Sequence, residues 1–185
     1  MTPPKPMKSA EDLAAGARKA IASEAAILFT VAGQMFAIAA DGVQEIRSTD
    51  SLAGGANEID QAEIAKVRHT IVRGHRTYYV VNAGVHFSLP TTRPALVMIL
   101  RQRRIAVLVD AIERMAEIPA VHPLPQAFTG PERLWYRGLA YIDDSIIPVV
   151  DPAGFLTGEE IRRLDHAAAP HAPTSSAQSE SAVPS

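Results

Sequence analysis

The chain has 185 residues, of which 47% are hydrophobic and 21% are charged, with a formal net charge of −2. This size and composition predict one folded soluble domain, or two small ones that share a core. The absence of cysteine excludes disulfides, zinc–thiolate sites and thiol chemistry, and the balanced charge argues against a protein held mainly by phosphate contacts.

The two ends differ in composition from the middle of the chain. Residues 1–24 contain several prolines and lysines and are expected to be a tail with a short helix from Ser9 to about Ala22. Residues 167–185 are mostly Ala, Pro, Ser and Thr and are expected to be disordered. The folded domain is therefore expected over residues 25–166. No apolar run reaches the roughly 20 residues of a membrane span, and no signal peptide is recognisable, so we expect a cytoplasmic protein.

Short apolar runs separated by Gly, Pro and Asp fill the folded part and predict a mainly β protein. In the first half we expect strands at 27–31, 35–40, 43–47 and 78–81, a loop at 48–57 and a short helix at 59–67. In the second half we expect strands at 96–100, 105–110, 112–118, 136–142 and 146–151, and an extended connector at 119–131. Thr157 and Glu160 form a capping box that predicts a last helix from Gly158 to about His166.

The two halves match when the chain is displaced by 69 positions against itself. Apolar residues at 27–29 then fall on 96–98, Asp41 falls on Asp110, and residues 80–82 fall on 149–151. The Arg73-Gly74 and Arg137-Gly138 pairs differ by 64, which predicts a longer hairpin in the second copy. The repeat favours two similar small β units side by side, each too small to bury much alone.

Residues that could support catalysis form no recognisable site. The six histidines lack metal-ligand spacing and are expected at the surface or hydrogen-bonded, and no nucleophile elbow or phosphate-binding loop occurs. Asp143 and Asp144 lie in an expected hairpin turn, where Asp caps the backbone. An enzyme would need polar groups from distant segments to converge in the groove between the units.

Two binding functions remain as interpretations. One is a nucleic-acid-binding β-barrel that uses Arg101, Arg103 and Arg104, although only 5% of the chain is aromatic and could stack on bases. The other is an adaptor whose strand edges and groove accept a strand or helix of another protein. The lack of catalytic motifs together with the paired β units favours the adaptor.

Four motifs follow one another between residues 25 and 165. They are Val43-Gln44-Glu45-Ile46-Arg47 after a Gly turn, Arg73-Gly74, Val107-Leu108-Val109-Asp110 followed by Ile112, and Arg137-Gly138-Leu139-Ala140 leading through 146–151 to Phe155-Leu156. In this order and spacing they resemble the CheW family of bacterial chemotaxis coupling proteins. The chain departs from the family pattern at Ile71-Val72, where Asn-Leu is usual, and at Ala106, where Gly is usual.

The resemblance implies a mainly β fold of two intertwined five-stranded β-barrel subdomains packed together, with a few short helices. It implies a non-enzymatic scaffold, without metal or cofactor, that joins the cytoplasmic tip of methyl-accepting chemoreceptors to the regulatory domain of a CheA-type histidine kinase. It places partner contact at Val43 and Glu45 and coupling at Arg73 and Gly74, and we expect apolar packing from Val43, Ile46 and Val72 beside them. We expect no nucleic-acid partner and no insertion into the membrane, and a location in the cytoplasm at receptor arrays.

Overall fold

The computed structural model describes residues 23–52, 56–59, 64–90 and 92–168. The helix expected at 9–22 lies outside the described residues, as does nearly all of each expected tail. The strands are β1 (Glu24–Val31), β2 (Gln34–Ala39), β3 (Val43–Ser48), β4 (Ala56–Glu58), β5 (Val67–Arg73), β6 (Arg76–Asn82), β7 (Leu96–Leu100), β8 (Ile105–Val109), β9 (Ala111–Ile118), β10 (Tyr136–Ile142) and β11 (Ser145–Val150). The helices are η1 (Ala40–Gly42), η2 (Thr49–Leu52), α2 (Ala83–His86), η3 (Pro131–Leu134), η4 (Pro152–Gly154) and α3 (Gly158–Ala168).

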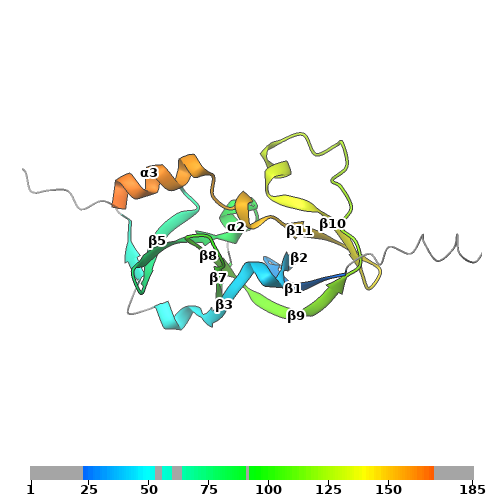
Figure 1. Ribbon diagram of the computed structural model, residues 1–185, viewed down its shortest axis with the longest axis horizontal. Helices are drawn as coiled ribbons and strands as arrows, with labels where there is room; N and C mark the ends of the chain where they lie inside the picture. Colours follow the sequence, from blue (N-terminus) through cyan, green and yellow to red (C-terminus); the bar gives the residue numbers. More distant parts are fainter. Residues whose placement is uncertain (1–22, 53–55, 60–63, 91, 169–185) are drawn as a thin grey trace, which may run out of the picture.

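The strands form two sheets that pack side by side (Figure 1). One is five-stranded, with the order β10-β11-β2-β1-β9, and the other is six-stranded, with the order β3-β7-β8-β6-β5-β4. The prediction of a mainly β fold with two packed subdomains and few helices is therefore confirmed. Within the described residues, the two end strands of each sheet do not form hydrogen bonds with each other. Each sheet is therefore curled but does not close into a continuous hydrogen-bonded barrel.

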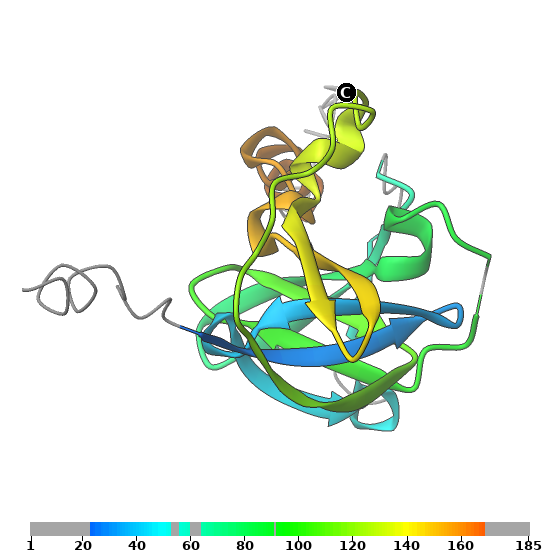
Figure 2. The ribbon, with the colours of Figure 1, turned by 90° about the vertical axis from the view of Figure 1, so that its right-hand side faces the viewer.

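The 69-residue repeat runs through all five main strands. The bounds of β10 are those of β5 plus 69, and β1, β2, β3 and β6 correspond in the same way to β7, β8, β9 and β11. Each sheet takes the first two strands of one repeat and the last three strands of the other. Each unit therefore combines strands of both repeats, and the two units are intertwined as the family resemblance implied. Figure 2 shows the blue strands β1 and β2 lying between green β9 and the yellow-gold β10–β11 hairpin.

Parallel pairing explains how the repeats exchange strands. In the first repeat η1, and in the second the Asp110 turn, takes the chain from the second strand of the repeat (β2 or β8) to its third strand (β3 or β9), which is an end strand of the other sheet. β2 then pairs in parallel with β11 at Val149↔Ala37, and β6 pairs in parallel with β8 from Tyr79↔Ile105 onward. Parallel strands need a crossover. For β2 and β11 it runs through the six-stranded sheet, and for β6 and β8 it is the connection through α2 and β7.

Three apolar cores result from this arrangement. One lies inside the five-stranded sheet around Leu28 and Val149, and another inside the six-stranded sheet around Val80 and Val97. The third and largest lies between the sheets and contains alternate residues of the same strands, such as Phe29 and Val81. The central strands are thus buried on both faces, which explains why they are continuous apolar runs in the sequence.

Two expectations for the first half of the chain are wrong. The helix expected at 59–67 is not formed at its described end, because Ile64 lies in a bend and Val67 begins β5. Residues 60–63 lie outside the described residues. The strand β5 was not expected, because its polar residues obscure the alternation, yet Val67, Thr70 and Ile71 are buried.

The alignment of the two Arg-Gly pairs at an offset of 64 is also wrong. Arg73 ends β5 at a hairpin turn, whereas Arg137 is the second residue of β10. At the true offset of 69 the equivalent of Gly74 is Asp143, and both positions have positive φ in the turn. The second hairpin therefore has the same length as the first.

The last helix begins with the expected capping box. The Thr157 hydroxyl accepts a hydrogen bond from the Glu160 amide, and the Glu160 carboxylate accepts one from the Thr157 amide. Leu164 of α3 packs into the shared core. The Tyr79 hydroxyl of β6 donates a 2.5 Å hydrogen bond to Asp165, which also accepts one from Arg104 at 2.6 Å. Burial and the Asp165 charge raise the pKa of Tyr79.

We expect Tyr79→Phe to lower the free energy of unfolding by about 1 kcal/mol, because it removes the hydrogen bond that fastens α3 to the sheet. Chemical denaturation followed by fluorescence measures this change. Tyr141→Phe, at an exposed tyrosine, is the matched control and should have no effect. Equal stability of both variants would show that the bond contributes nothing.

Candidate functional site

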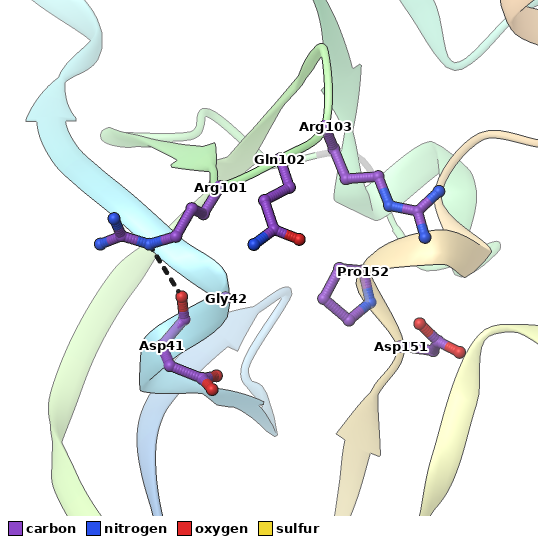
Figure 3. Close-up of a pocket in the computed structure, with 7 residues that line it drawn as sticks. All are labelled: Asp41, Gly42, Arg101, Gln102, Arg103, Asp151 and Pro152. Atoms are coloured by element: carbon purple, nitrogen blue, oxygen red, sulfur yellow. Dashed lines mark hydrogen bonds between the residues drawn. The ribbon is translucent and has the colours of Figure 1, made fainter.

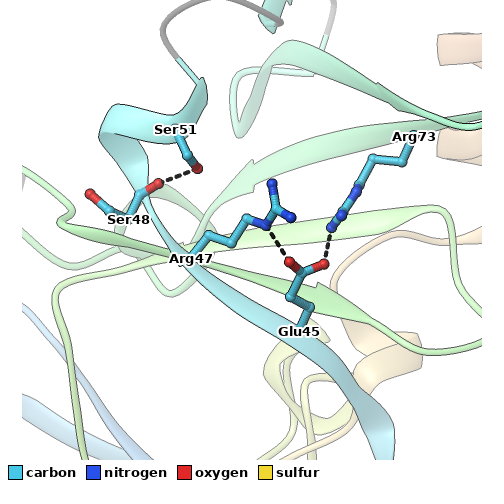
Figure 4. Close-up of polar contacts among 5 residues, drawn as sticks. All are labelled: Glu45, Arg47, Ser48, Ser51 and Arg73. Carbon is cyan, nitrogen blue, oxygen red and sulfur yellow. Dashed lines mark hydrogen bonds and ion pairs between the residues drawn. The ribbon is translucent and has the colours of Figure 1, made fainter.

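The residues that the sequence associates with partner contact lie on β3 and at the end of β5. These strands occupy the first and fifth places in the order of the six-stranded sheet. The sheet curls enough that Glu45 of β3 and Arg73 of β5 form an ion pair (Figure 4). Side chains far apart in the ladder thus meet at the open seam of the curled sheet.

Glu45 is the centre of a three-residue charge cluster. Its two carboxylate oxygens accept hydrogen bonds from Arg73 Nη1 and from Arg47 Nε (Figure 4). The Arg73 and Arg47 guanidinium groups lower the pKa of Glu45, with the larger contribution from Arg73. All three side chains are partly exposed, at 29% for Glu45, 32% for Arg73 and 47% for Arg47. The cluster is therefore an accessible surface feature with both signs of charge.

The apolar residues of the predicted set divide between the interior and the surface. Val43 is buried, and Ile46 packs against the shared core, so both mainly fix the position of β3. Val72 is 57% exposed and precedes Arg73 on β5. Gly74 follows in the hairpin turn with a φ of +59°, a conformation that favours glycine. Val72 is thus the member of the apolar set that the structure presents to solvent.

A polar hollow of about 240 Å³ lies where the two sheets meet (Figure 3). It is lined by Asp41, Gly42, Arg101, Gln102, Arg103, Asp151 and Pro152. Arg101 Nε donates a 3.0 Å hydrogen bond to the Asp41 carbonyl, and the Asp151 carboxylate caps η4 by accepting from the Ala153 amide at 2.8 Å. The polar groups here mostly serve turns and caps of the fold.

The three arginines considered for nucleic-acid binding do not act together. Arg101 holds the η1 backbone, Arg104 binds Asp165 on α3, and Arg103 faces the hollow. Arg101 and Arg103 line the same hollow, but it also contains Asp41 and Asp151, and Arg104 is paired with Asp165, so the three arginines do not form one continuous phosphate-binding strip.

His86 is a residue whose role the sequence did not reveal. It was expected to be exposed or hydrogen-bonded, but it is 4% exposed and its Nε2 has no hydrogen-bond partner. Its ring lies 4.7 Å from Trp135, 4.9 Å from Phe87 and 5.1 Å from Phe155, measured between centroids. Burial, assisted by the Lys66 charge and opposed by Glu160, lowers the pKa of His86 to about 3. The offset of 69 makes Phe155 its repeat equivalent, which was a signal in the sequence that this position belongs to the core.

Arg47 was also missed, although it lies in the first family motif. No sequence pattern shows that its side chain shares the Glu45 carboxylate, because the contact depends on the local course of β3.

Within the part of the chain that the structure describes, no three His, Cys, Asp or Glu residues are grouped so that they could hold a metal ion. No helix among the described residues is long and apolar enough to cross a bilayer.

Comparisons with known proteins give one consistent result. The family model described as CheW-like domain matches residues 25–160. The fold is similar to the crystal structure of the scaffolding protein TtCheW from Thermoanaerobacter tengcongensis, with a TM-score of 0.63 and 16% sequence identity over 75% of this chain and 97% of that chain. A search of curated proteins finds no match.

Proposed function

The chain belongs to the CheW-like domain family, and we propose on that basis that it is a non-enzymatic chemotaxis adaptor that couples methyl-accepting chemoreceptors to a CheA-type histidine kinase. In this role the protein positions other proteins and carries out no chemical step. The observation that carries the proposal is the family match over residues 25–160, which spans both intertwined units. We propose that the protein acts in the cytoplasm, at receptor arrays, without entering the membrane.

We propose that the kinase regulatory domain contacts the seam formed by β3 and the end of β5. Glu45, Arg73 and Gly74 lie at this seam, Val72 adds exposed apolar surface, and Val43 and Ile46 hold β3 in position from beneath. Charged pairs at the rim of an interface give specificity and faster association, while a small apolar contact gives affinity.

Arg73 suits this role even though it is already paired with Glu45. Its guanidinium has five N–H donors and uses Nη1 for Glu45, so donors remain for a partner carboxylate. Arg47 keeps Glu45 neutralised if Arg73 turns to the partner. The cluster can therefore rearrange without leaving a carboxylate alone.

We expect Arg73→Glu to weaken binding to the purified regulatory domain of a CheA-type kinase at least tenfold, because it places a second carboxylate beside Glu45. Isothermal titration calorimetry measures this affinity. Glu45→Arg/Arg47→Glu/Arg73→Glu restores both internal ion pairs with reversed polarity, so it should recover folding stability but not binding.

Arg103→Glu, at an exposed arginine in the hollow, is the control for net charge and should bind like the wild type. If the wild-type chain binds neither the kinase domain nor a receptor tip, the adaptor proposal fails. Binding of a single-stranded oligonucleotide that weakens with salt and is lost in Arg101/Arg103/Arg104→Ala would instead support the nucleic-acid alternative.

A further inference from the structure

The segment between β9 and β10 lies over the body of the molecule without a core of its own. It consists of the 119–131 connector, η3 and Trp135, and we call residues 119–135 the strap. None of its residues is buried, and Figure 1 shows the yellow-green connector standing out above β10. A segment that buries so little apolar surface has low local stability.

Few backbone contacts hold the strap to the two sheets. Two of them are the hydrogen bonds that His122 and Leu139 exchange. A third runs from the Asp151 amide to the Trp135 carbonyl at 2.9 Å. Among the described residues, the other backbone hydrogen bonds of the strap join residues within it and can move with it. The strap can therefore separate by breaking three backbone bonds while the ladders of both sheets stay intact.

Trp135 is the strap residue that covers His86. Its ring lies 4.7 Å from the His86 ring and 6.0 Å from the Phe87 ring, measured between centroids. Val85, the neighbour of His86 on α2, is 43% exposed, so α2 itself lies at the surface. His86 is 4% exposed under the closed strap, and displacement of the Trp135 ring would bring it to solvent.

The closed strap offers His86 nothing that would hold a proton on its ring. Its Nε2 has no hydrogen-bond partner, and three aromatic rings surround the imidazole. The charges that act on it are Lys66, before β5, and Glu160 of α3, which form an ion pair of 2.8 Å with each other. These two charges act in opposite directions, and burial has the larger effect.

The other charged groups near the strap do not depend on His86. Glu132 accepts a hydrogen bond from the backbone of the strap, and Arg133 donates one to it. Asp151 caps η4, and His122 is exposed in the closed strap. His86 is therefore the titratable group whose solvation changes when the strap opens.

We propose that the strap opens locally while both sheets remain folded, and that protonation of His86 favours the open strap, so that mild acid increases its population. In the closed strap the buried imidazole stays neutral, whereas in the open strap it is solvated and takes up a proton readily. The strap is then a pH-sensitive element built into the fold. The inference goes beyond the adaptor proposal, because it involves no kinase and no receptor.

The direction follows from the linkage between opening and protonation. The open state binds a proton at His86 below about pH 6.5, so the ratio of open to closed strap rises as the pH falls. Burial lowers the pKa of His86 to about 3 in the closed strap, so this ratio should increase about thirtyfold between pH 7.5 and pH 5.

Hydrogen exchange of the full chain, followed by NMR at single amides, tests the inference. The amides of His122, Leu139 and Asp151 donate the three bonds that opening breaks. Their protection, corrected for the intrinsic exchange rate, therefore measures the open population. At pH 7.5 we expect these amides to be about tenfold or more less protected than the amides of β1 and β7, which report global unfolding. Their protection should fall about thirtyfold by pH 5.

His86→Phe should keep these three amides less protected than the core but abolish the pH dependence of their protection. Trp135→Ala uncovers His86 even in the closed strap, so the pH dependence should also shrink in this second variant. His122→Gln, at the exposed histidine of the strap, is the matched control and should behave like the wild type. Circular dichroism and thermal unfolding show that each variant is folded.

Two results would overturn the inference. Equal protection of the strap amides and the core amides would show that only global unfolding releases the strap. A wild-type pH dependence in His86→Phe would show that another group favours the open strap. Loss of kinase binding alone would overturn only the adaptor proposal, because hydrogen exchange of the isolated chain does not involve a partner.

Discussion

The wild-type protein should lose about 2 kcal/mol of unfolding free energy between pH 7.5 and pH 5, and His86→Phe should abolish most of this loss. Burial lowers the pKa of His86 to about 3 in the folded protein, from its ordinary value of 6.5. A group with a depressed folded pKa stabilises the fold fully above the unfolded pKa, and this contribution falls as the pH drops below about 6.5. Protonation therefore favours the unfolded chain throughout this interval.

The interval from pH 7.5 to pH 5 isolates His86 from the carboxylates. Glu45, Glu160 and Asp165 also have lowered pKa values, but their ordinary values of 4.5 for Glu and 3.8 for Asp place their effect at lower pH. Urea denaturation at each pH, followed by the fluorescence of Trp135, measures the change. Trp135 is the single tryptophan of the chain and its ring contacts His86.

Phenylalanine is a conservative replacement at position 86 because the side chain lies among the rings of Phe87, Trp135 and Phe155, and the repeat equivalent of this position is itself a phenylalanine, Phe155. The variant also removes the buried Nε2 that has no partner, so it should be at least as stable as the wild type at pH 7.5. His75→Gln, at an exposed histidine, is the control and should keep the wild-type pH dependence. A His86→Phe variant with the wild-type slope would refute the assignment.

Gly138→Ala should destabilise the protein by about 3 kcal/mol, because the added methyl group has no space. A Cβ at this position would lie 2.1 Å from the His122 carbonyl oxygen and 2.8 Å from Val121 Cγ1. His122 and Leu139 exchange two backbone hydrogen bonds of 2.8 Å, which hold the 119–131 connector against β10. The connector must move away from β10 to admit the methyl group, and these bonds are then lost.

Gly158→Ala is the matched control for this substitution. Gly158 begins α3, and a Cβ there meets nothing within 4 Å, so this variant should stay within about 0.5 kcal/mol of the wild type. Thermal and urea denaturation of the two variants give the comparison. Similar stability of Gly138→Ala and Gly158→Ala would show that the 119–131 connector can move away from β10 without lowering the free energy of unfolding.

The sequence was sufficient to predict the strands that are buried on both faces and the repeat that relates them. Runs such as 96–100 and 105–109 are continuously apolar, so their positions are clear without any tertiary information. The exchange of strands between repeats was not predictable from the residues, because an apolar strand of either repeat fits either core. Only the family resemblance indicated it.

For the candidate site, the sequence identified the residues but not the contacts between their side chains. The resemblance named Glu45 and Arg73 separately, yet their ion pair depends on the curl of a sheet in which they lie four strands apart. The proposed role of these residues in partner contact stays a prediction.

The exchange of strands also affects how the chain can fold during its synthesis. The six-stranded sheet needs β8, which ends at Val109, and the five-stranded sheet needs β11, which ends at Val150. A nascent chain that has left the ribosome only as far as residue 93 can complete neither core, because each lacks strands that are still to be made. The protein therefore cannot fold one repeat at a time, and its early hairpins must stay soluble until the second repeat emerges.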